Sequence, residues 1–190
     1  MQVVLASASP RRLELISQLG WEARVHPSAF EEAGGSASEA KDVVLANALG
    51  KGRWVAEKLG DELPVIGADT IVVVDNVILG KPKDAADAAM MLTRLSGRDH
   101  QVMTGVAIFY KGKVLGRVCV TKVFFRSLTE QEITGYVATG EPLDKAGAYG
   151  IQGQGAVMVE KIDGCYNNVV GLPLTMMYTM FKELGVELSE

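Results

Sequence analysis

The side chains that could do chemistry are charged residues beside glycine, proline or small residues, where predicted helices and strands end. The acidic ones are Glu32 and Asp69, and the basic ones are Arg11, Arg12, Lys51, Lys81 and, as a further candidate, Lys145. Two carboxylates suit a hard divalent cation, because Mg²⁺ commonly takes one or two carboxylates together with substrate phosphates. Lysine and arginine nearby would neutralise phosphate charge. The set indicates a site for a metal-bound polyphosphate, where Asp69 or the metal activates water.

Asp69 also has a structural interpretation. It interrupts the apolar run of residues 63–81, which reads as two buried strands that turn at Asp75-Asn76. A buried charge is costly unless it is paired, and Asp69 or Thr70 could instead cap the turn between the strands. In the same way, Lys81 could mark only the exit from the second strand.

The other charged candidates have ordinary alternatives as well. Arg11 and Arg12 occupy the first turn of a predicted helix, where the dipole disfavours cations, so they are either solvated or bind an anion. Glu32 and its neighbour Glu31 lie in a polar loop, where carboxylates are usually solvated. Lys51 lies on a predicted helix and could be a surface residue.

Composition bounds the class of protein. The chain has 190 residues and is 48% hydrophobic, which predicts one domain over residues 1–190, either undivided or built as two small lobes around a central cleft. The net charge of −4 argues against nucleic acid and anionic membrane as partners. No apolar run is long enough to span a bilayer, and the first residues lack the pattern of a signal peptide.

Cysteine and histidine are scarce. Cys119 and Cys165 lack CxxC spacing and are too few for a disulfide framework, so we expect a cytoplasmic protein. His26 and His100 are the only histidines, which excludes a multi-histidine metal site. Any metal would be a hard cation on carboxylates.

Apolar periodicity and turn residues predict a mixed α/β fold, with a sheet that is not purely doubly wound. Two glycines, Gly50 and Gly52, fall inside one predicted helix and indicate close packing or a local break. We expect strands at residues 3–5, 22–26, 63–81 (a pair), 100–110, 113–125, 157–162 and 165–170. We expect helices at residues 10–19, 38–59, 84–96 and 129–139, and a last one beginning at Pro173 that turns Leu174, Met177 and Phe181 toward the core. Asp84 is the expected N-cap of the third helix, with Asp87 as its acidic partner, and Thr129 with Glu132 predicts a capping box at the fourth. We expect residues 141–155 to form a loop, and the strands at 157–162 and 165–170 to form a final hairpin.

Common fingerprints of other activities are missing. The sequence contains neither GxxxxGK[ST] nor GxGxxG, so the usual phosphate-binding loops are absent. It also lacks Gly-x-Ser-x-Gly, and no histidine lies near Ser7 or Ser9 in the sequence, which disfavours a serine hydrolase.

Several ordered blocks together resemble the Maf family of nucleoside triphosphate pyrophosphatases, almost from end to end. The blocks are LASASPRR at residues 5–12, GADT at 67–70, KP at 81–82, LSG at 95–97, HQVMT at 100–104, EPLDKAGAYGIQG at 141–153 and VGLP at 170–173. The resemblance implies a central twisted mixed sheet flanked by helices, similar to the fold of inosine-triphosphate pyrophosphatases. It also implies hydrolysis between the α and β phosphates, giving nucleoside monophosphate and pyrophosphate.

The resemblance also implies roles for individual residues. Asp69 stands at the general-base position, with Lys51 and Lys81 as the catalytic lysines. Glu32, rather than Glu31, would hold a divalent cation such as Mg²⁺ or Mn²⁺ together with Asp69. Phosphate binding would involve Ser7, Arg11, Arg12, Lys51 and Lys81.

Base selection follows from the same resemblance. Relatives that carry the equivalents of Arg12, Thr70 and Gln152 act on dTTP and UTP, whereas a branch acting on 7-methyl-GTP has an acidic residue at the glutamine position. A glutamine amide has one donor side and one acceptor side, which complements the N3–H and carbonyl of uracil or thymine. Guanine could also meet an amide, so the family pattern is what favours pyrimidines.

Two functions are compatible with these residues. The first is a metal-dependent dTTP/UTP pyrophosphatase that removes unwanted nucleotides. The alternative is a nucleotide-binding regulator of cell division and septum formation with little turnover. Asp69 beside a lysine cluster favours the enzyme, because binding alone would not need a carboxylate facing phosphates.

The resemblance further implies a homodimer.

Overall fold

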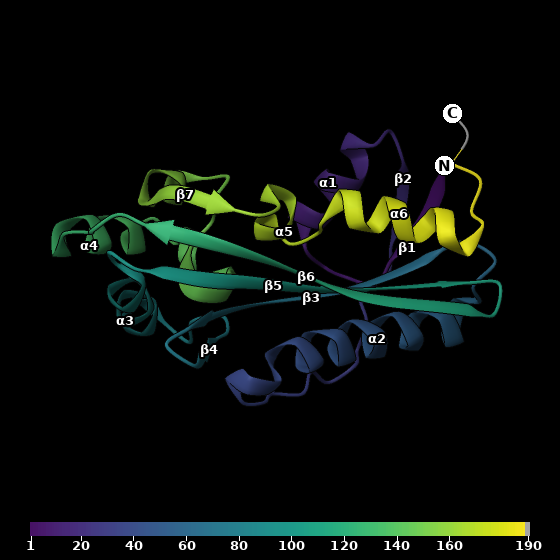
Figure 1. Cartoon of the computed structure of the whole chain (residues 1–190), viewed down its shortest axis with the longest axis horizontal. Coiled ribbons are helices and arrows are strands. Elements are labelled where there is room, and N and C mark those ends of the chain that lie inside the picture. Colours follow the sequence, from purple (N-terminus) through teal and green to yellow (C-terminus); the bar gives the residue numbers. More distant parts are fainter. Residues whose placement is uncertain (189–190) are drawn as a thin grey trace.

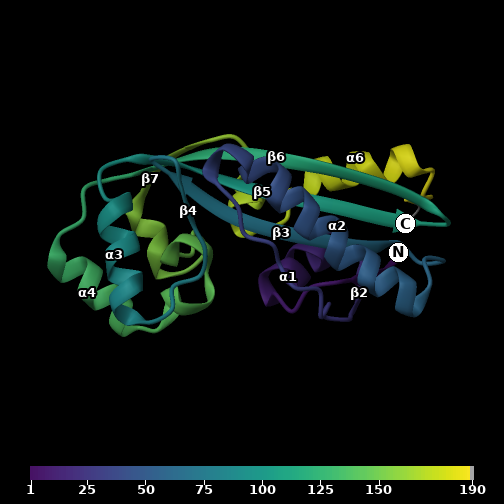
Figure 2. The ribbon, with the colours of Figure 1, turned by 90° about the horizontal axis from the view of Figure 1, so that it is seen from below.

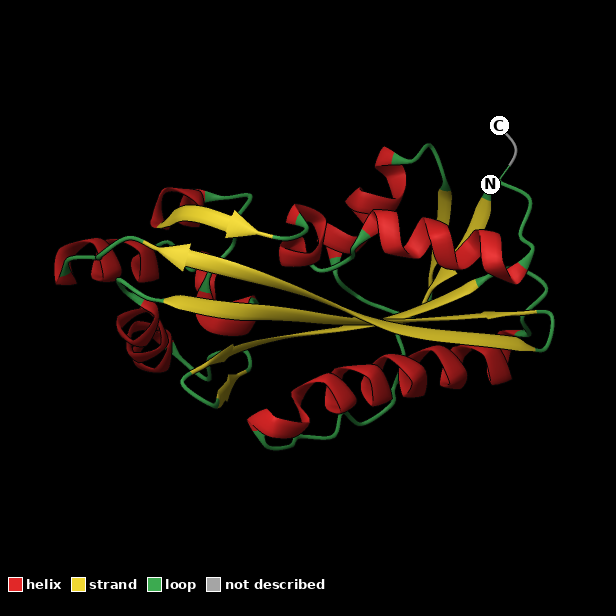
Figure 3. Ribbon diagram, viewed as in Figure 1, coloured by secondary structure: helices red, strands yellow, loops and turns green. Residues whose placement is uncertain are grey.

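Three long antiparallel strands form the centre of the sheet. They are β3 (Val65–Val74), β5 (Asp99–Tyr110) and β6 (Lys113–Phe125) in the computed structural model, which describes residues 1–188. β5 pairs with β3 on one side and with β6 on the other. Figure 3 shows these strands running the length of the molecule, with helices on both faces.

Shorter strands complete a seven-stranded mixed sheet in the order β2-β1-β3-β5-β6-β7, with β4 paired to β3. β1 (Gln2–Leu5) is parallel to both β2 (Glu22–Val25) and β3, whereas the other pairings are antiparallel. β4 (Val77–Leu79) and β7 (Val159–Asp163) are short. The predicted mixed α/β sheet is therefore confirmed.

One edge of β3 is only partly covered. β1 pairs with it at Val65 and Ile66, and β4 pairs with it from Val72 to Val74. Between them, residues 67–71 pair with a strand only on the other edge, where β5 lies, within the part of the chain that the structure describes. Such a point, where a strand's neighbours diverge, is where α/β sheets usually bind ligands.

Helix α2 (Ala40–Leu59) packs directly on the backbone of β3 and β5 on one face of the sheet (Figure 1). A Cβ added at Gly67 would lie 2.1 Å from the carbonyl oxygen of Ala48, and one at Gly105 would lie 2.3 Å from that of Val44. Only glycine permits this close approach. The helix is continuous through Gly52, so close packing rather than a break explains the two helix glycines.

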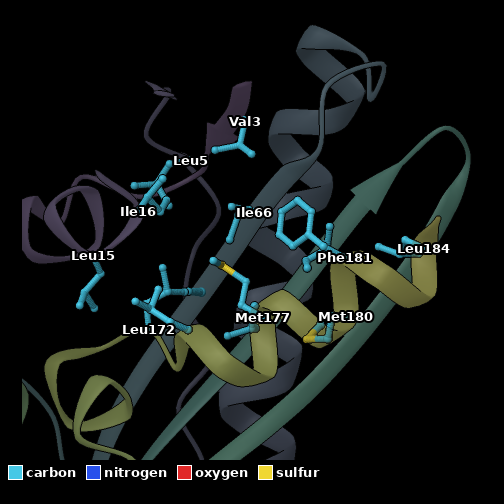
Figure 4. Packing of buried hydrophobic residues seen from close by; sticks show 14 of the residues in the cluster. Val3, Leu5, Leu15, Ile16, Ile66, Leu172, Met177, Met180, Phe181 and Leu184 are labelled. Carbon is cyan, nitrogen blue, oxygen red and sulfur yellow. The ribbon is translucent and has the colours of Figure 1, made fainter. Parts of the chain in front are cut away.

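The opposite face is covered by α1 (Pro10–Gln18), α5 (Tyr166–Val170) and α6 (Leu174–Leu184) (Figure 1). Figure 4 shows the core there, in which Leu5 lies beside Ile16 of α1 and Ile66 lies near side chains of α6. Met177 and Phe181 are fully buried, as predicted for the helix that follows Pro173.

A second core lies at the far end of the long strands. It is covered by α3 (Ala85–Leu95) and α4 (Glu130–Ala138), and Figure 2 shows both helices at the end opposite β2 and α6. The predicted caps are confirmed: the Asp84 side chain accepts from the Asp87 amide, and Thr129 and Glu132 form a capping box. No helix within residues 1–188 is long and apolar enough to cross a membrane.

The predicted final hairpin is wrong. Residues 166–170 form α5 instead of a strand, so β7 pairs with β6 and not with a following strand. The buried Asn168 amide donates to the Val102 carbonyl and to Thr121 Oγ1, both at 3.0 Å, which holds α5 against the sheet. The pattern of a short apolar run does not separate a strand from a buried helical turn, and here tertiary hydrogen bonds decide.

The predicted loop of residues 141–155 is partly helical. It contains the 3₁₀ turns η2 (Glu141–Asp144) and η3 (Ala146–Ala148), and η4 (Gln154–Met158) begins in it. A further turn, η1 (Ala37–Glu39), precedes α2.

Candidate active site

A cleft of about 890 Å³ opens beside the uncovered edge of β3. Its volume lies within the range of small-molecule sites. All of the site residues predicted from the sequence line it, from segments far apart in the chain: Ser7, Arg11, Arg12, Glu32, Lys51, Asp69, Thr70, Lys81, Lys145 and Gln152.

Asp69 lies in this cleft with both carboxylate oxygens engaged. It is 5% exposed, and Lys51 Nζ lies 2.7 Å from Oδ1 while Asn47 Nδ2 lies 3.0 Å from Oδ2. Asn47 and Lys51 are four residues apart on α2 and so share one face of the helix. The lysine supplies the partner that a buried carboxylate requires.

Glu32 reaches the same lysine from the loop of residues 26–36. Its Oε1 lies 2.6 Å from Lys51 Nζ, so one ammonium bridges two carboxylates. The Glu32 side chain is 58% exposed, in contrast to the buried Asp69. Asn47 fixes this loop, because its side-chain amide both accepts from the Ala33 amide (2.9 Å) and donates to the Ala33 carbonyl (3.1 Å).

The buried Arg12 connects α1, β3 and the end of α5. Its Nη1 donates to Ser7 Oγ (2.9 Å) and to the Ala68 carbonyl (3.0 Å), and its Nε donates to the Gly171 carbonyl (2.8 Å). Nη2 donates to Thr70 Oγ1 at 3.0 Å. Four of its five N–H groups are thus used within the protein. Burial lowers the pKa of Arg12, and the charge of Asp69 opposes that effect.

Arg11 and Lys145 meet across the cleft on one carboxylate. Asp144 accepts from Arg11 Nη1 at 2.7 Å and from Lys145 Nζ at 2.6 Å. Partial burial alone would raise the pKa of Asp144, but the hydrogen bonds from Lys145 and Arg11 lower it to about 2. Asp144 therefore stays charged and holds these two cations at the rim.

Lys81 and Gln152 are placed differently. Lys81 is exposed at the rim, just after β4, and Gln152 is exposed in the segment that follows η3. No hydrogen bond or ion pair joins either side chain to the rest of residues 1–188. Both are free to contact a ligand in the cleft.

Thr70 lies beside Asp69 but on the other face of the sheet, since successive strand residues alternate. Its hydroxyl is 3.0 Å from that of Thr104 and also accepts from Arg12. The cleft therefore runs past the edge of β3, with Asp69 on the α2 face and Thr70 on the α1 face.

The carboxylates suit a hard cation in number and chemistry. Glu32 and Asp69 share Lys51, which brings them close together, and Glu32 Oε2 carries no other partner among residues 1–188. No cluster of three or more His, Cys, Asp or Glu forms a metal site by itself in the described residues. Two carboxylates fit a cation that completes its shell with substrate phosphates and water.

Two residues of the site were not predicted. Asn47 was missed, although asparagine in a helix interior one turn before Lys51 is a signal, because it is a poor helix former. Glu141 was missed as well: it organises the segment that carries Gln152, and its partners lie 5 to 14 residues away along the chain.

The fold and the cleft first place the chain among α/β proteins with a mixed sheet and a cleft beside its central strand. The structure resembles the Ham1 protein of Staphylococcus aureus with a TM-score of 0.54 and 14% sequence identity, covering 97% of this chain and 100% of that chain. At this identity the likeness shows a shared α/β fold only.

The particular family follows from sequence. Residues 2–184 match the family profile described as Maf-like protein, and the chain belongs to this Maf family. It is 50% identical to a dTTP/UTP pyrophosphatase of Geobacter metallireducens, over 97% of this chain and 96% of the relative. It is 51% identical to a dTTP/UTP pyrophosphatase of Salmonella typhimurium, over 95% of this chain and 92% of the relative.

Proposed function

We propose that the protein is a nucleoside triphosphate pyrophosphatase that hydrolyses dTTP and UTP between the α and β phosphates. The observation that carries this proposal is the buried Asp69, paired at 2.7 Å with Lys51 in a cleft lined by further cations. The names of relatives about 50% identical over nearly the full chain support it.

In this proposal the triphosphate binds along the cations of the cleft. Arg11, Lys81 and Lys145 line the cleft and would take phosphate oxygens, as would Lys51, which is paired with Asp69. Charge develops on the phosphate oxygens in the transition state, and fixed cations that line the cleft would stabilise it.

Asp69 would accept the proton of the attacking water. Lys51 and Asn47 hold its carboxylate in one orientation, so the base need not reorganise during the reaction. Arg12 has one N–H left for substrate, and its other donors fix the strand edge around Asp69 and Thr70.

The divalent cation, Mg²⁺ or Mn²⁺, would be held by Glu32 and Asp69. When bound, it would polarise phosphate oxygens and lower the pKa of coordinated water. Lys51 lies between the two carboxylates, so its ammonium would be placed to contact a phosphate oxygen of a substrate bound beside them.

Gln152 would read the base. Its free amide matches the N3–H and an adjacent carbonyl of uracil or thymine. A site that hydrogen-bonds these edges rejects analogues that leave its polar groups unpaired. Thr70 and Arg12 would shape the same end of the cleft.

The test is a nucleotide panel. Purified protein is incubated with UTP, dTTP, CTP, ATP and GTP and with Mg²⁺, Mn²⁺ or excess EDTA, and pyrophosphate is measured separately from orthophosphate. We expect pyrophosphate and monophosphate from UTP and dTTP, and loss of both with EDTA. Orthophosphate alone would indicate a phosphatase, and no product from any triphosphate would favour the regulator of cell division, which the names of the relatives do not support.

The homodimer and the cytoplasmic location also stay predictions. Light scattering after size-exclusion chromatography tests the first: a mass near twice the 20.3 kDa of the chain is expected.

A further inference from the structure

The segment that carries Gln152 wraps around a single carboxylate, that of Glu141. Glu141 Oε1 accepts from the Tyr136 hydroxyl at 2.8 Å and, more weakly, from the Gly155 amide at 3.4 Å. Its Oε2 accepts from the Gln154 amide at 3.0 Å. The Tyr136 hydroxyl in turn accepts from the Gly150 amide at 3.1 Å. Backbone anchors therefore flank Gln152 on both sides, two residues before it and two and three residues after it.

The contact is tight as well as polar. A Cβ added at Gly153 would lie 2.4 Å from Glu141 Oε1, and one at Gly150 would lie 2.7 Å from Lys145 Cε. The Lys145 ammonium donates to the Glu141 carbonyl at 2.6 Å. Burial alone would raise the pKa of Glu141, but the donors around it and the charge of Lys145 lower it, so the carboxylate stays ionised. Charge-assisted hydrogen bonds of this kind are roughly twice as strong as neutral ones.

We propose that Glu141 is a positioning residue for base selection: its carboxylate, with the Tyr136 hydroxyl, fixes the backbone of residues 150–155 so that Gln152 meets the base in one geometry. This inference rests on the proposed function. Glu141 lines the cleft, but both of its oxygens are occupied by protein donors, so it acts through Gln152 instead of touching substrate.

The rest of the segment has anchors of its own. The Tyr149 hydroxyl lies 2.8 Å from His100 Nε2 in a buried aromatic cluster, and the Gly147 amide donates to the Gly80 carbonyl at 3.0 Å. Loss of the Glu141 carboxylate should therefore loosen residues 150–155 without unfolding the protein. A Gln152 side chain on a looser backbone would lose more conformational entropy when it binds the base, so recognition of the base should weaken.

The test compares E141Q and Y136F with the control E130Q, which changes an exposed carboxylate on α4. Steady-state kinetics are measured for UTP and GTP. In E141Q we expect KM for UTP to rise about tenfold, with kcat kept within about twofold. The ratio of kcat/KM for UTP to kcat/KM for GTP should fall by about tenfold as well, which corresponds to about 1.4 kcal/mol. Y136F should move the ratio in the same direction, and E130Q should not move it.

A double-mutant cycle with Q152A separates positioning from a general structural role. If Glu141 acts through Gln152, E141Q added to Q152A should leave the UTP-to-GTP ratio unchanged. Equal losses of kcat for both nucleotides, or an additive further loss of selectivity in the double variant, would overturn the inference. Wild-type protein without pyrophosphatase activity would instead overturn the proposed function, so the two failures are distinguishable.

Discussion

The two walls of the cleft are built in different ways. On the wall that we propose binds the phosphates, called the phosphate wall, Asn47 and Lys51 of helix α2 hold the buried Asp69 of the central strand β3. On the wall that we propose binds the base, called the base wall, a segment of short 3₁₀ turns wraps around Glu141, and Gln152 itself stays exposed without a protein partner among residues 1–188.

The difference shows how the side chains of each wall are held in position. Side chains on a long helix and a paired strand are fixed by packing, because glycines let α2 approach the sheet closely. The base wall is fixed mainly by backbone hydrogen bonds to one carboxylate, so it can adapt without disturbing the sheet. In the proposed function, the chemistry common to all triphosphates would fall on the rigid wall, and selection among bases would fall on the adjustable one.

The largest expected effect is on the phosphate wall. D69N keeps the shape and an acceptor for Lys51 but removes the base, so kcat for UTP should fall about 10²- to 10⁴-fold. The fold should persist by circular dichroism. D75N, at an exposed turn of the same strand pair, serves as the matched control. Full activity in D69N would remove Asp69 from the mechanism.

A smaller effect is expected at Asn47, which supports both carboxylates of that wall. N47A loses two hydrogen bonds to Ala33 and one to Asp69, which should lower the free energy of unfolding by about 2 kcal/mol. Activity should fall about tenfold, because the loop carrying Glu32 loosens. Urea denaturation and UTP kinetics measure both effects. The control is K41A, at an exposed position of the same helix, which should change neither the stability nor the activity. An N47A protein of wild-type stability would show that the loop does not depend on the hydrogen bonds of Asn47.

On the base wall, Q152E should weaken UTP and dTTP about tenfold in kcat/KM. The substitution removes the amide donor and adds a negative charge near the triphosphate. Thermal stability should stay at the wild-type value, because the Gln152 side chain has no described protein partner. Q131E adds the same charge on exposed α4 and is the control. Unchanged dTTP kinetics in Q152E would show that Gln152 does not read the base.

The smallest effect concerns the rim, where Asp144 joins η2 to Arg11 of α1. The pKa of Asp144 lies at about 2 in the folded protein, below its ordinary value. Its ion pairs therefore stabilise the fold above about pH 4, and this contribution is lost as the pH falls toward 2. D144N should therefore be less stable than wild type near neutral pH, by under about 1 kcal/mol because the carboxylate is half exposed. Unfolding free energies measured from pH 7 to pH 2 should converge at the acid end. A constant difference would contradict this assignment.

Most of the fold was predictable, because its signals are local. Caps at Asp84 and Thr129 and the apolar stripe after Pro173 each predict a helix from a few neighbouring residues. Residues 165–170 were predicted wrongly, because their apolar pattern is too short to set a period and the buried Asn168 decides their conformation from a distance.

By itself, the sequence determined the fold class, the family and the membership of the candidate site, because residue type and ordered blocks carry that information. The tertiary structure decided the pairings. One lysine bridges Glu32 and Asp69, and Arg12 uses four of its N–H donors within the protein. Glu141 holds the segment around Gln152. The physical reason is distance along the chain. These contacts join residues up to 159 positions apart, and only the packing of α2, β3 and α5 around one uncovered strand edge brings them together.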